Sequence, residues 1–257
     1  MSSSADAVAA LAYDALSADE LRRQLGVARI ELFDSVGSTL DIAHEIAPGA
    51  ESGTLVLADR QTAGRGRQGR RWESPSGAGI WLTLIERPHD PRALDVLSLR
   101  CGLRAATALD APAGARVQLK WPNDLYVRGR KLAGILIETR WRGSAPDWVA
   151  IGFGINVLPP DLETATGLTA GTSRLQVLAL LVPALREAAH AVGHLTTEEI
   201  AQFRRRDVAV AQRVKAPAAG VVAGIDAAGE LLITQPDGIV SRHRTGSLTF
   251  EDPLPCS

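Results

Sequence analysis

The sequence predicts an α+β fold: helices packed on a mixed, largely antiparallel sheet, followed by a small β-barrel at the C-terminal end. Three observations support this. Strand patterns outnumber helical ones, Gly-containing turns join neighbouring strands directly, and the last part of the chain holds only short strands. Direct turns favour antiparallel pairing, because parallel strands need a longer crossover. A doubly wound parallel sheet is therefore disfavoured.

Apolar runs and helical spacing place the main elements. Strands are expected near residues 29–33, 54–60, 79–86, 117–120, 124–127, 132–139 and 148–156. Helices are expected near residues 38–47, 92–110 and 173–192, where apolar residues recur at helical spacing. The segments 127–130 and 142–146 each contain a glycine and supply turns between neighbouring strands.

The C-terminal part has a different pattern. After Phe203, short strands are expected near residues 212–215, 219–225, 230–235, 238–243 and 247–250, separated by the turn signals Ala227-Ala228-Gly229 and Pro236-Asp237-Gly238. Short strands broken by frequent turns describe a small barrel. We therefore expect residues 208–257 to form a domain of their own.

The N-terminal part predicts a helical extension over residues 1–28, before a main domain at 29–207. Leu11, Leu16, Leu21 and Leu25 have helical spacing. Ser17 and Glu20 form a capping-box pattern that would start a second short helix. This segment is too short for a winged-helix domain.

Composition indicates a globular protein without a global charge. The 257 residues are 46% hydrophobic, which is enough for a sizeable core. The 28 basic and 29 acidic side chains nearly cancel, so the protein has no large net charge that would attract nucleic acid or an anionic membrane. The two cysteines fit neither a disulfide framework nor a metal cluster, and Cys101 is expected to be a buried small hydrophobe. No leader pattern precedes the first strand, so the cytoplasm is the expected compartment.

The segment GRGRQGRRW, residues 64–72, is the most informative stretch. Its glycines can turn backbone N–H groups toward a ligand, and its arginines match carboxylate and phosphate oxygens. Trp72 ends the loop with a ring on which an adenine could stack, or which anchors the loop to the core. By itself the loop is also consistent with a flexible charged turn or a nucleic-acid contact.

A second segment, KWPNDLYVRGRKLAGILIE at residues 120–138, places Asn123 and Asp124 in a turn and Lys131 before an apolar strand. Taken alone, Lys131 would be read as a solvated lysine, and the Asn-Asp pair as turn chemistry. Beside the arginine loop, however, these residues could gather two anions.

Both segments resemble motifs of the biotin protein ligases, which activate biotin with ATP and attach it to a carrier-protein lysine. The other matching motifs, in the same order, are FDSVGST at 33–39, GAGIWLTL at 77–84 and IGFGIN at 151–156, and the loop motif begins at LADRQTA, residue 57. Several motifs in one order are specific, whereas a Gly/Arg run alone is weak. The resemblance implies a class II synthetase-like catalytic domain, a C-terminal Src-homology-3-like barrel, and the monofunctional type without a DNA-binding domain.

The resemblance also implies roles for individual residues. Lys131, which would bind the biotin carboxylate and the α-phosphate, and Arg67, which would cover the activated intermediate, are the implied catalytic residues. The implied biotin-binding residues are Ser38, Thr39, Gln61, Gly64, Arg65, Gly66, Arg67, Lys131 and Gly134. The implied ATP-binding residues are Arg65, Arg67, Trp72, Lys120, Asn123, Lys131 and Asn156, and Asp124 is the implied contact for Mg²⁺.

One position departs from the family pattern. The family usually continues Ser-Thr with asparagine, but this chain has Leu40. Leu40 either lines the pocket for the ureido ring, where a polar contact would be lost, or packs inward from the first helical turn. Gly79 and Gly134 are expected to be close-approach sites, because a side chain there would fill the slot for biotin.

The implied partner is the biotin carboxyl carrier protein domain of an acyl-CoA carboxylase or pyruvate carboxylase, and neither nucleic acid nor a membrane is expected. Two other functions stay open. A lipoate or octanoate ligase of related fold is disfavoured by the intact GRGRQGRRW segment. A nucleic-acid-binding regulator that uses the Gly/Arg loop is disfavoured by the near-neutral charge.

Overall fold

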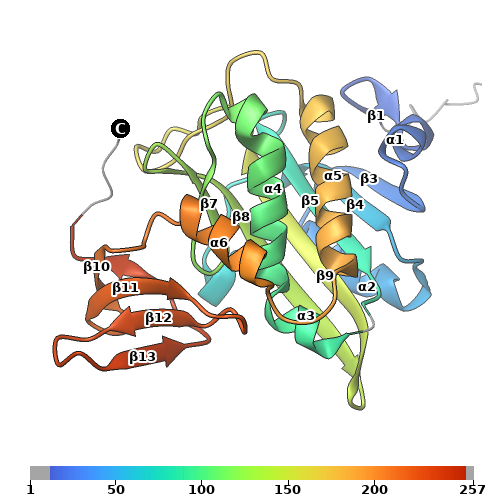
Figure 1. Cartoon of the computed structure of the whole chain (residues 1–257). Coiled ribbons are helices and arrows are strands. Elements are labelled where there is room, and N and C mark those ends of the chain that lie inside the picture. Colours follow the sequence, from blue (N-terminus) through green and yellow to red (C-terminus); the bar gives the residue numbers. More distant parts are fainter. Residues whose placement is uncertain (1–11, 89, 253–257) are drawn as a thin grey trace, which may run out of the picture.

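The computed structural model describes residues 12–88 and 90–252. Its centre is a seven-stranded sheet with the order β3-β4-β5-β9-β8-β7-β6. The strands are β3 (Arg29–Val36), β4 (Thr54–Gln61), β5 (Gly79–Glu86), β6 (Gln118–Lys120), β7 (Asp124–Val127), β8 (Arg130–Arg142) and β9 (Ala145–Asn156). Only β3 and β4 pair in parallel in this sheet, so the predicted α+β fold with a largely antiparallel sheet is confirmed (Figure 1).

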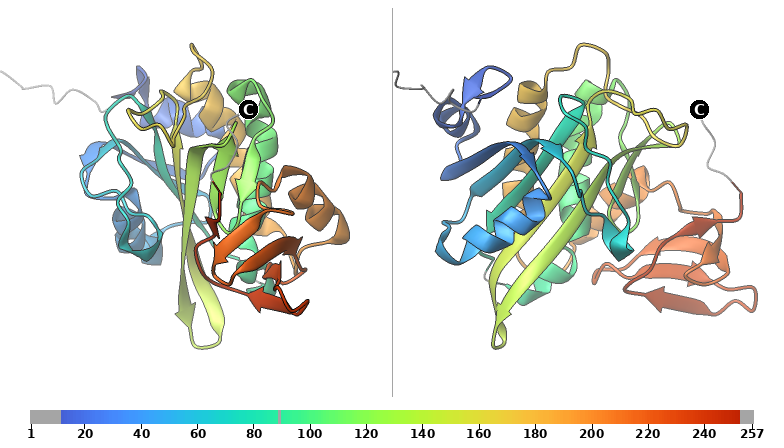
Figure 2. Two further views of the ribbon diagram at one scale, coloured as in Figure 1. Left: turned by 90° about the vertical axis from the view of Figure 1, so that its left-hand side faces the viewer. Right: turned by 180° about the vertical axis from the view of Figure 1, so that it is seen from behind.

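Helices cover both faces of this sheet. The long helices α4 (Leu97–Ala113) and α5 (Arg174–His190) lie side by side on one face, while α2 (Thr39–Ile46) lies on the other (Figure 2). In β4, Leu55 and Leu57 join the large hydrophobic core, whereas Val56 between them joins a smaller cluster around α2. Both faces are buried, so the strand is a continuous apolar run rather than an alternating one.

A second, five-stranded antiparallel sheet follows, with the order β13-β12-β11-β10-β14. Its strands are β10 (Arg213–Ala216), β11 (Gly220–Ile225), β12 (Leu231–Thr234), β13 (Val240–His243) and β14 (Thr249–Phe250), close to the predicted positions. The recorded pairings do not join β13 to β14, so closure into a barrel stays a prediction. The core runs without a break from the first sheet into the second, because Leu119 and Trp121 share one cluster with Val222 and Ile233.

The N-terminal segment differs in part from its prediction. Helix α1 (Ala18–Leu25) begins at the predicted capping box of Ser17 and Glu20. The helical prediction is wrong just before it, where β1 (Ala12–Tyr13) and β2 (Leu16–Ser17) form a small hairpin, and residues 5–11 lie outside the described part. A tertiary contact explains the difference, since the Arg174 guanidinium lies 4.0 Å from the centre of the Tyr13 ring.

Two further helices refine the prediction. The helix expected at 92–110 is broken at Val96 into α3 (Pro91–Asp95) and α4, and α6 (Thr197–Arg206) was not expected. Its start was readable, since Thr196 and Glu199 form a capping box. Single 3₁₀ turns lie at Ala47–Gly49 and Arg67–Gly69. None of the helices in residues 12–88 and 90–252 is long and apolar enough to cross a membrane.

A buried ion pair ties α6 to α4. Arg100 is 1% exposed, and its Nε donates to Glu199 Oε1 at 2.8 Å while its Nη2 donates to the His194 carbonyl at 2.8 Å. Arg100→Ala should lower the free energy of unfolding by about 3–5 kcal/mol, because it leaves the Glu199 carboxylate buried without its cation. Urea unfolding measures this change.

The control is the exposed pair on the same helix, Arg205 with Glu198, whose side chains are 56% and 68% exposed. Arg205→Ala should change the free energy of unfolding by at most about 1 kcal/mol. Equal effects of the two substitutions would contradict the assignment of the Arg100 pair as a structural tie.

Candidate active site

A cavity of about 1310 Å³ opens along β8 and β9 beside the arginine loop, and its lining includes every predicted site residue except Gly64. These residues come from the start of α2, the end of β4, the loop 64–72, the turn before β7, and strands β8 and β9. Residues up to 118 positions apart in the chain, Ser38 and Asn156, thus line one cavity. Their individual roles stay predictions.

One end of the cavity is polar. Ser38 caps α2, and its Oγ accepts a hydrogen bond from the Leu40 N–H at 3.3 Å. The N–H and the hydroxyl of Thr39 both donate to Gln61 Oε1, at 2.9 and 3.2 Å. The helix start therefore holds Gln61, which closes β4, and the three side chains form one group.

Leu40 follows this group. It was predicted either to line the pocket or to pack inward, and its position fits both descriptions. It is 4% exposed, yet it belongs to the cavity lining. Its Cδ1 occupies the space that a Cβ on Gly152 would fill, so the glycine makes room for the leucine. Leu40 thus closes the polar end of the cavity with an apolar wall.

The opposite end gathers cations around one carboxylate. Lys131 Nζ lies 2.7 Å from Asp124 Oδ1, and Arg67 Nη1 donates to Asn123 Oδ1 at 3.2 Å. Lys120 Nζ lies 5.2 Å from the centre of the Phe250 ring. Burial lowers the pKa of Arg67 and of Lys120 below their ordinary values. Charges removed from water in this way interact strongly with an anion that enters the cavity.

Backbone contacts hold this end in place. The Lys131 N–H donates to the Thr164 carbonyl at 2.9 Å, and the Thr166 N–H donates back to the Lys131 carbonyl at 2.9 Å. Asn123 is held by its own amide, whose Nδ2 donates to the Ile135 carbonyl at 2.8 Å. Asn156 donates likewise to the Thr166 carbonyl at 3.1 Å, so the loop after β9 is tied to the cavity wall.

An apolar slot joins the two ends. Gly134 and Gly154 are paired across β8 and β9, and the Trp72 ring lies on them. A Cβ on Gly154 would lie 2.6 Å from Trp72 Nε1, and one on Gly134 would lie 3.3 Å from Cζ3. Trp81 meets Trp72 edge-on with 6.5 Å between ring centres. Trp72 therefore lines the middle of the cavity and is anchored there.

Two glycines serve the loop and the sheet rather than the cavity. Gly64 lies behind the polar end, where its carbonyl accepts the Trp72 N–H at 2.9 Å, and a Cβ on it would lie 2.9 Å from Ser74 Oγ. Gly79, expected to leave room for a ligand, instead leaves room for the Trp81 ring and is absent from the lining. Both positions need glycine because protein atoms fill the space.

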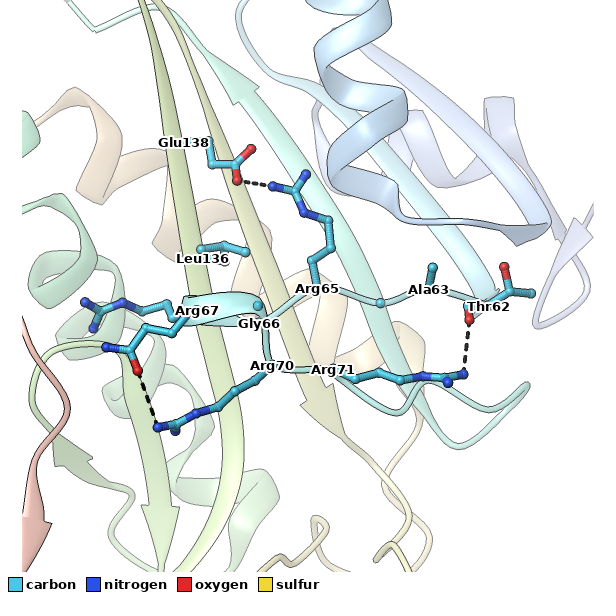
Figure 3. A pocket seen from close by; sticks show the side chains of 12 residues that line it. Thr62, Ala63, Arg65, Gly66, Arg67, Arg70, Arg71, Leu136 and Glu138 are labelled. Carbon is cyan, nitrogen blue, oxygen red and sulfur yellow. Dashed lines mark hydrogen bonds and ion pairs between the residues drawn. The ribbon is translucent and has the colours of Figure 1, made fainter.

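Arg65 is bound by carboxylates on the outer side of the loop. Its Nη1 donates to Asp41 Oδ1 at 2.5 Å and its Nη2 to Glu138 Oε1 (Figure 3). His44 Nε2 lies 2.8 Å from the other oxygen of Glu138. This side of the loop forms a smaller cavity of about 470 Å³, which also borders Gly64. An ATP contact by the Arg65 guanidinium would require these ion pairs to break.

The C-terminal sheet contributes residues that the sequence did not single out, namely Ser247, Leu248, Thr249 and Phe250 in the cavity lining. Ser247 Oγ donates to Gln68 Oε1 at 3.0 Å, and so connects the second sheet to the arginine loop. No local motif marks these residues, because they read as an ordinary turn and short strand. Only the packing of the two sheets brings them to the site.

Comparison with known proteins identifies the family. The model of the biotin/lipoate A/B protein ligase family matches residues 33–156. Biotin–[acetyl-CoA-carboxylase] ligase of Paracoccus denitrificans is 34% identical over 229 residues, which cover 78% of this chain and 92% of that protein. The chain therefore belongs to the biotin/lipoate A/B protein ligase family.

Two further relatives define the extent of the likeness. The bifunctional ligase/repressor BirA of Bacillus spizizenii is 44% identical over 126 residues, which are 48% of this chain and only 39% of that protein. The structure of the biotin protein ligase from Aquifex aeolicus in complex with biotin and ATP superposes with a TM-score of 0.69 and 25% identity. It covers 86% of this chain and 98% of that one.

The position of Leu40 leads to a testable expectation. Leu40→Asn should destabilise the protein by about 1–3 kcal/mol, because the leucine is buried against Gly152 and a polar amide in its place is removed from water and loses this apolar contact. Thermal and urea unfolding measure the change. Leu40→Met, which keeps an apolar side chain of similar volume, should cost less than about 1.5 kcal/mol. Equal stability of the Asn variant and the parent would show that the wall tolerates a polar group.

Proposed function

We propose that this protein is a biotin–[biotin carboxyl carrier protein] ligase. It joins biotin and ATP to give biotinyl-5′-adenylate and pyrophosphate, and then transfers biotin to a carrier lysine with release of AMP. The observation that carries this proposal is the order of chemistry along β8 and β9: a hydrogen-bonding end beside Gly152, an apolar slot at Gly154 and Gly134, and a cationic end at Lys131. Biotin has the same order, with a ureido ring, an aliphatic tail and a carboxylate.

The polar end favours biotin over an acid with an apolar end. Ser38 and Thr39 are 2% and 3% exposed, so a ligand without polar atoms would leave the remaining hydrogen-bonding capacity of their hydroxyl groups unused at a buried position. Sites built to hydrogen-bond a ligand reject analogues that lack the polar group. Octanoate has no partner for Ser38, Thr39 or Gln61, and lipoate offers only a disulfide.

The cationic end provides what adenylation requires. The carboxylate must approach the α-phosphate although both are anions, and Lys131 lies where the slot meets the charged end. We propose that its ammonium binds both groups and stabilises the charge that develops on the phosphate. Arg67, held by Asn123, would cover the adenylate and retain it until the carrier lysine attacks. Trp72 would pack against the aliphatic tail, because its ring lies in the slot.

Asp124 has the chemistry to hold Mg²⁺. This ion commonly takes one or two protein carboxylates together with substrate phosphates, rather than a cage of side chains. In residues 12–88 and 90–252 no three His, Cys, Asp or Glu side chains form a metal cluster, which is consistent with that mode. The buried Oδ1 of Asp124 accepts no well-oriented hydrogen bond, although Lys131 Nζ lies 2.7 Å from it, so a metal ion bound there would take the place of the ammonium as its partner. When bound, Mg²⁺ would neutralise phosphate charge.

The partner would be a biotin carboxyl carrier domain of an acyl-CoA carboxylase or pyruvate carboxylase, acting in the cytoplasm. The Paracoccus relative is named for transfer to acetyl-CoA carboxylase. A carrier lysine attacks the mixed anhydride, so no covalent intermediate with the enzyme is needed. Transfer of radiolabelled biotin, compared with labelled lipoate and octanoate, tests the proposal, and preferential transfer of octanoate would refute it.

Lys131→Ala should reduce pyrophosphate release with biotin and ATP by at least about a hundredfold, because a site that gathers two anions loses a central cation. Lys215→Ala is the matched control, since this lysine lies on β10 outside the cavity lining and its Nζ donates to the Glu251 carbonyl at 3.4 Å. Near-parental release by a folded Lys131 variant would disprove its role.

Arg67→Gly should act on retention more than on formation of the adenylate. The activated acid should escape faster and label lysines of bystander proteins, which mass spectrometry of an added non-substrate protein detects. Arg128→Gly, in the turn between β7 and β8 and with positive φ, is the control and should label only the carrier. Strictly carrier-specific labelling by the Arg67 variant would count against a covering role.

A further inference from the structure

A chain of hydrogen bonds lies behind the polar end of the cavity. Thr83, on β5, is fully buried, and its Oγ1 lies 2.9 Å from Thr39 Oγ1. Ser74, after the arginine loop, is 3% exposed, and its Oγ lies 2.9 Å from Gln61 Nε2. Thr39, Gln61 and Ser74 belong to the cavity lining, whereas Thr83 does not. Thr83 therefore acts on any ligand only through Thr39.

The direction of each hydrogen bond follows from one backbone group. The Thr39 N–H can only donate, and it points at Gln61 Oε1 at 2.9 Å, so the amide oxygen rather than the nitrogen faces Thr39. The Thr39 hydroxyl lies 3.2 Å from the same oxygen and must donate its single hydrogen to it. The Thr83 hydroxyl must then be the donor to Thr39 Oγ1.

The other side of Gln61 is determined in the same way. Its Nε2 can only donate, and it donates to Ser74 Oγ. Ser74 in turn donates its hydrogen to the Trp72 carbonyl at 3.1 Å, so Ser74 cannot reverse its direction. The order of donation is therefore Thr83 to Thr39, Thr39 to Gln61, Gln61 to Ser74, and Ser74 to the backbone.

This order leaves a defined set of groups for a ligand. Gln61 Nε2 keeps one free N–H, and Thr39 Oγ1 keeps one lone pair after donating once and accepting once. Ser38 Oγ accepts from the Leu40 N–H, so its hydroxyl hydrogen is available. Ser38 Oγ also keeps its second lone pair, so the polar end offers two donors and two acceptors. A cyclic urea offers the complement, a carbonyl with two lone pairs beside N–H donors.

We propose that Thr83 and Ser74 are positioning residues that set this donor–acceptor pattern and so make the pocket select a cyclic urea. The inference rests on the proposed function, because it assigns the urea to biotin. Thr83 holds the Thr39 hydroxyl from behind and directs its remaining lone pair into the cavity. Ser74 holds the Gln61 amide from the other side and keeps its second N–H directed at the ligand.

The test compares Thr83→Val and Thr83→Ser in a pyrophosphate-release assay with biotin and ATP. Valine has the same shape but cannot donate, so the KM for biotin should rise about tenfold, while kcat and the KM for ATP stay within about twofold. Serine restores the donor and should restore the KM for biotin. Thr54→Val is the control for a buried Thr-to-Val change, because Thr54 lies on β4 outside the cavity lining, is fully buried, and donates its hydroxyl hydrogen to the Glu51 carbonyl at 2.8 Å.

A second variant keeps the test decisive if Thr83→Val does not fold. Ser74→Ala removes the acceptor for Gln61 Nε2 and should also raise the KM for biotin about tenfold. In a Thr39→Val background, Thr83→Val should add less than about twofold, because its effect passes through the Thr39 hydroxyl.

The outcomes separate the two proposals. A parental protein that releases no pyrophosphate with biotin refutes the proposed function. A parental protein that does, together with a folded Thr83→Val or Ser74→Ala variant of unchanged KM for biotin, overturns only the positioning role. Equal losses in kcat, the KM for ATP and the KM for biotin, without rescue by serine, would also overturn it, because they indicate a general structural defect.

Discussion

The register between β8 and β9 is the constraint on which the site depends. It places Gly134 directly opposite Gly154, and the absence of two side chains opens the slot in which Trp72 lies. A shift by one residue would turn neighbouring side chains of both strands into that space. The long antiparallel pairing of β8 with β9, which ends in the turn at Gly143, fixes this register. The pairing of two neighbouring strands therefore decides the shape of the cavity.

The slot separates a group of neutral hydrogen-bonding side chains from a group of cationic side chains. At one end, neutral groups on the first turn of α2 and the end of β4 form hydrogen bonds with one another and keep a few donors and acceptors unused. At the other end, Lys131 and Arg67 lie around Asp124 and Asn123. Because the slot lies between the two groups, one sheet can present neutral hydrogen-bonding groups and cations to different parts of a single ligand.

The second sheet completes the cavity rather than standing apart from it. Trp121 donates to the Gly229 carbonyl at 3.0 Å, and Ser247 reaches the arginine loop through Gln68. The loop is therefore held from two directions, by the Arg65 ion pairs on one side and by the C-terminal sheet on the other.

Most of the fold was predictable, because its signals are local. Strands such as β5 and β9 are unbroken apolar runs, and α1 and α2 begin at serine caps. The hairpin at residues 12–17 was missed, since the contact of Arg174 with Tyr13 overrides the helical spacing there. Helix α6 was missed although its capping box was visible, because charged residues dominate its sequence and leave too few apolar residues to show helical spacing.

The sequence by itself determined which residues could bind anions and a polar ring, because residue types and motif order suffice for that. Only the tertiary structure decided where those residues point. It paired Arg65 with Asp41 and Glu138, laid Trp72 on paired glycines, and brought Ser247 and Phe250 to the site. It also placed Thr83 behind Thr39. Such contacts join residues far apart in the chain, and their geometry depends on strand register and sheet packing, which no local pattern encodes.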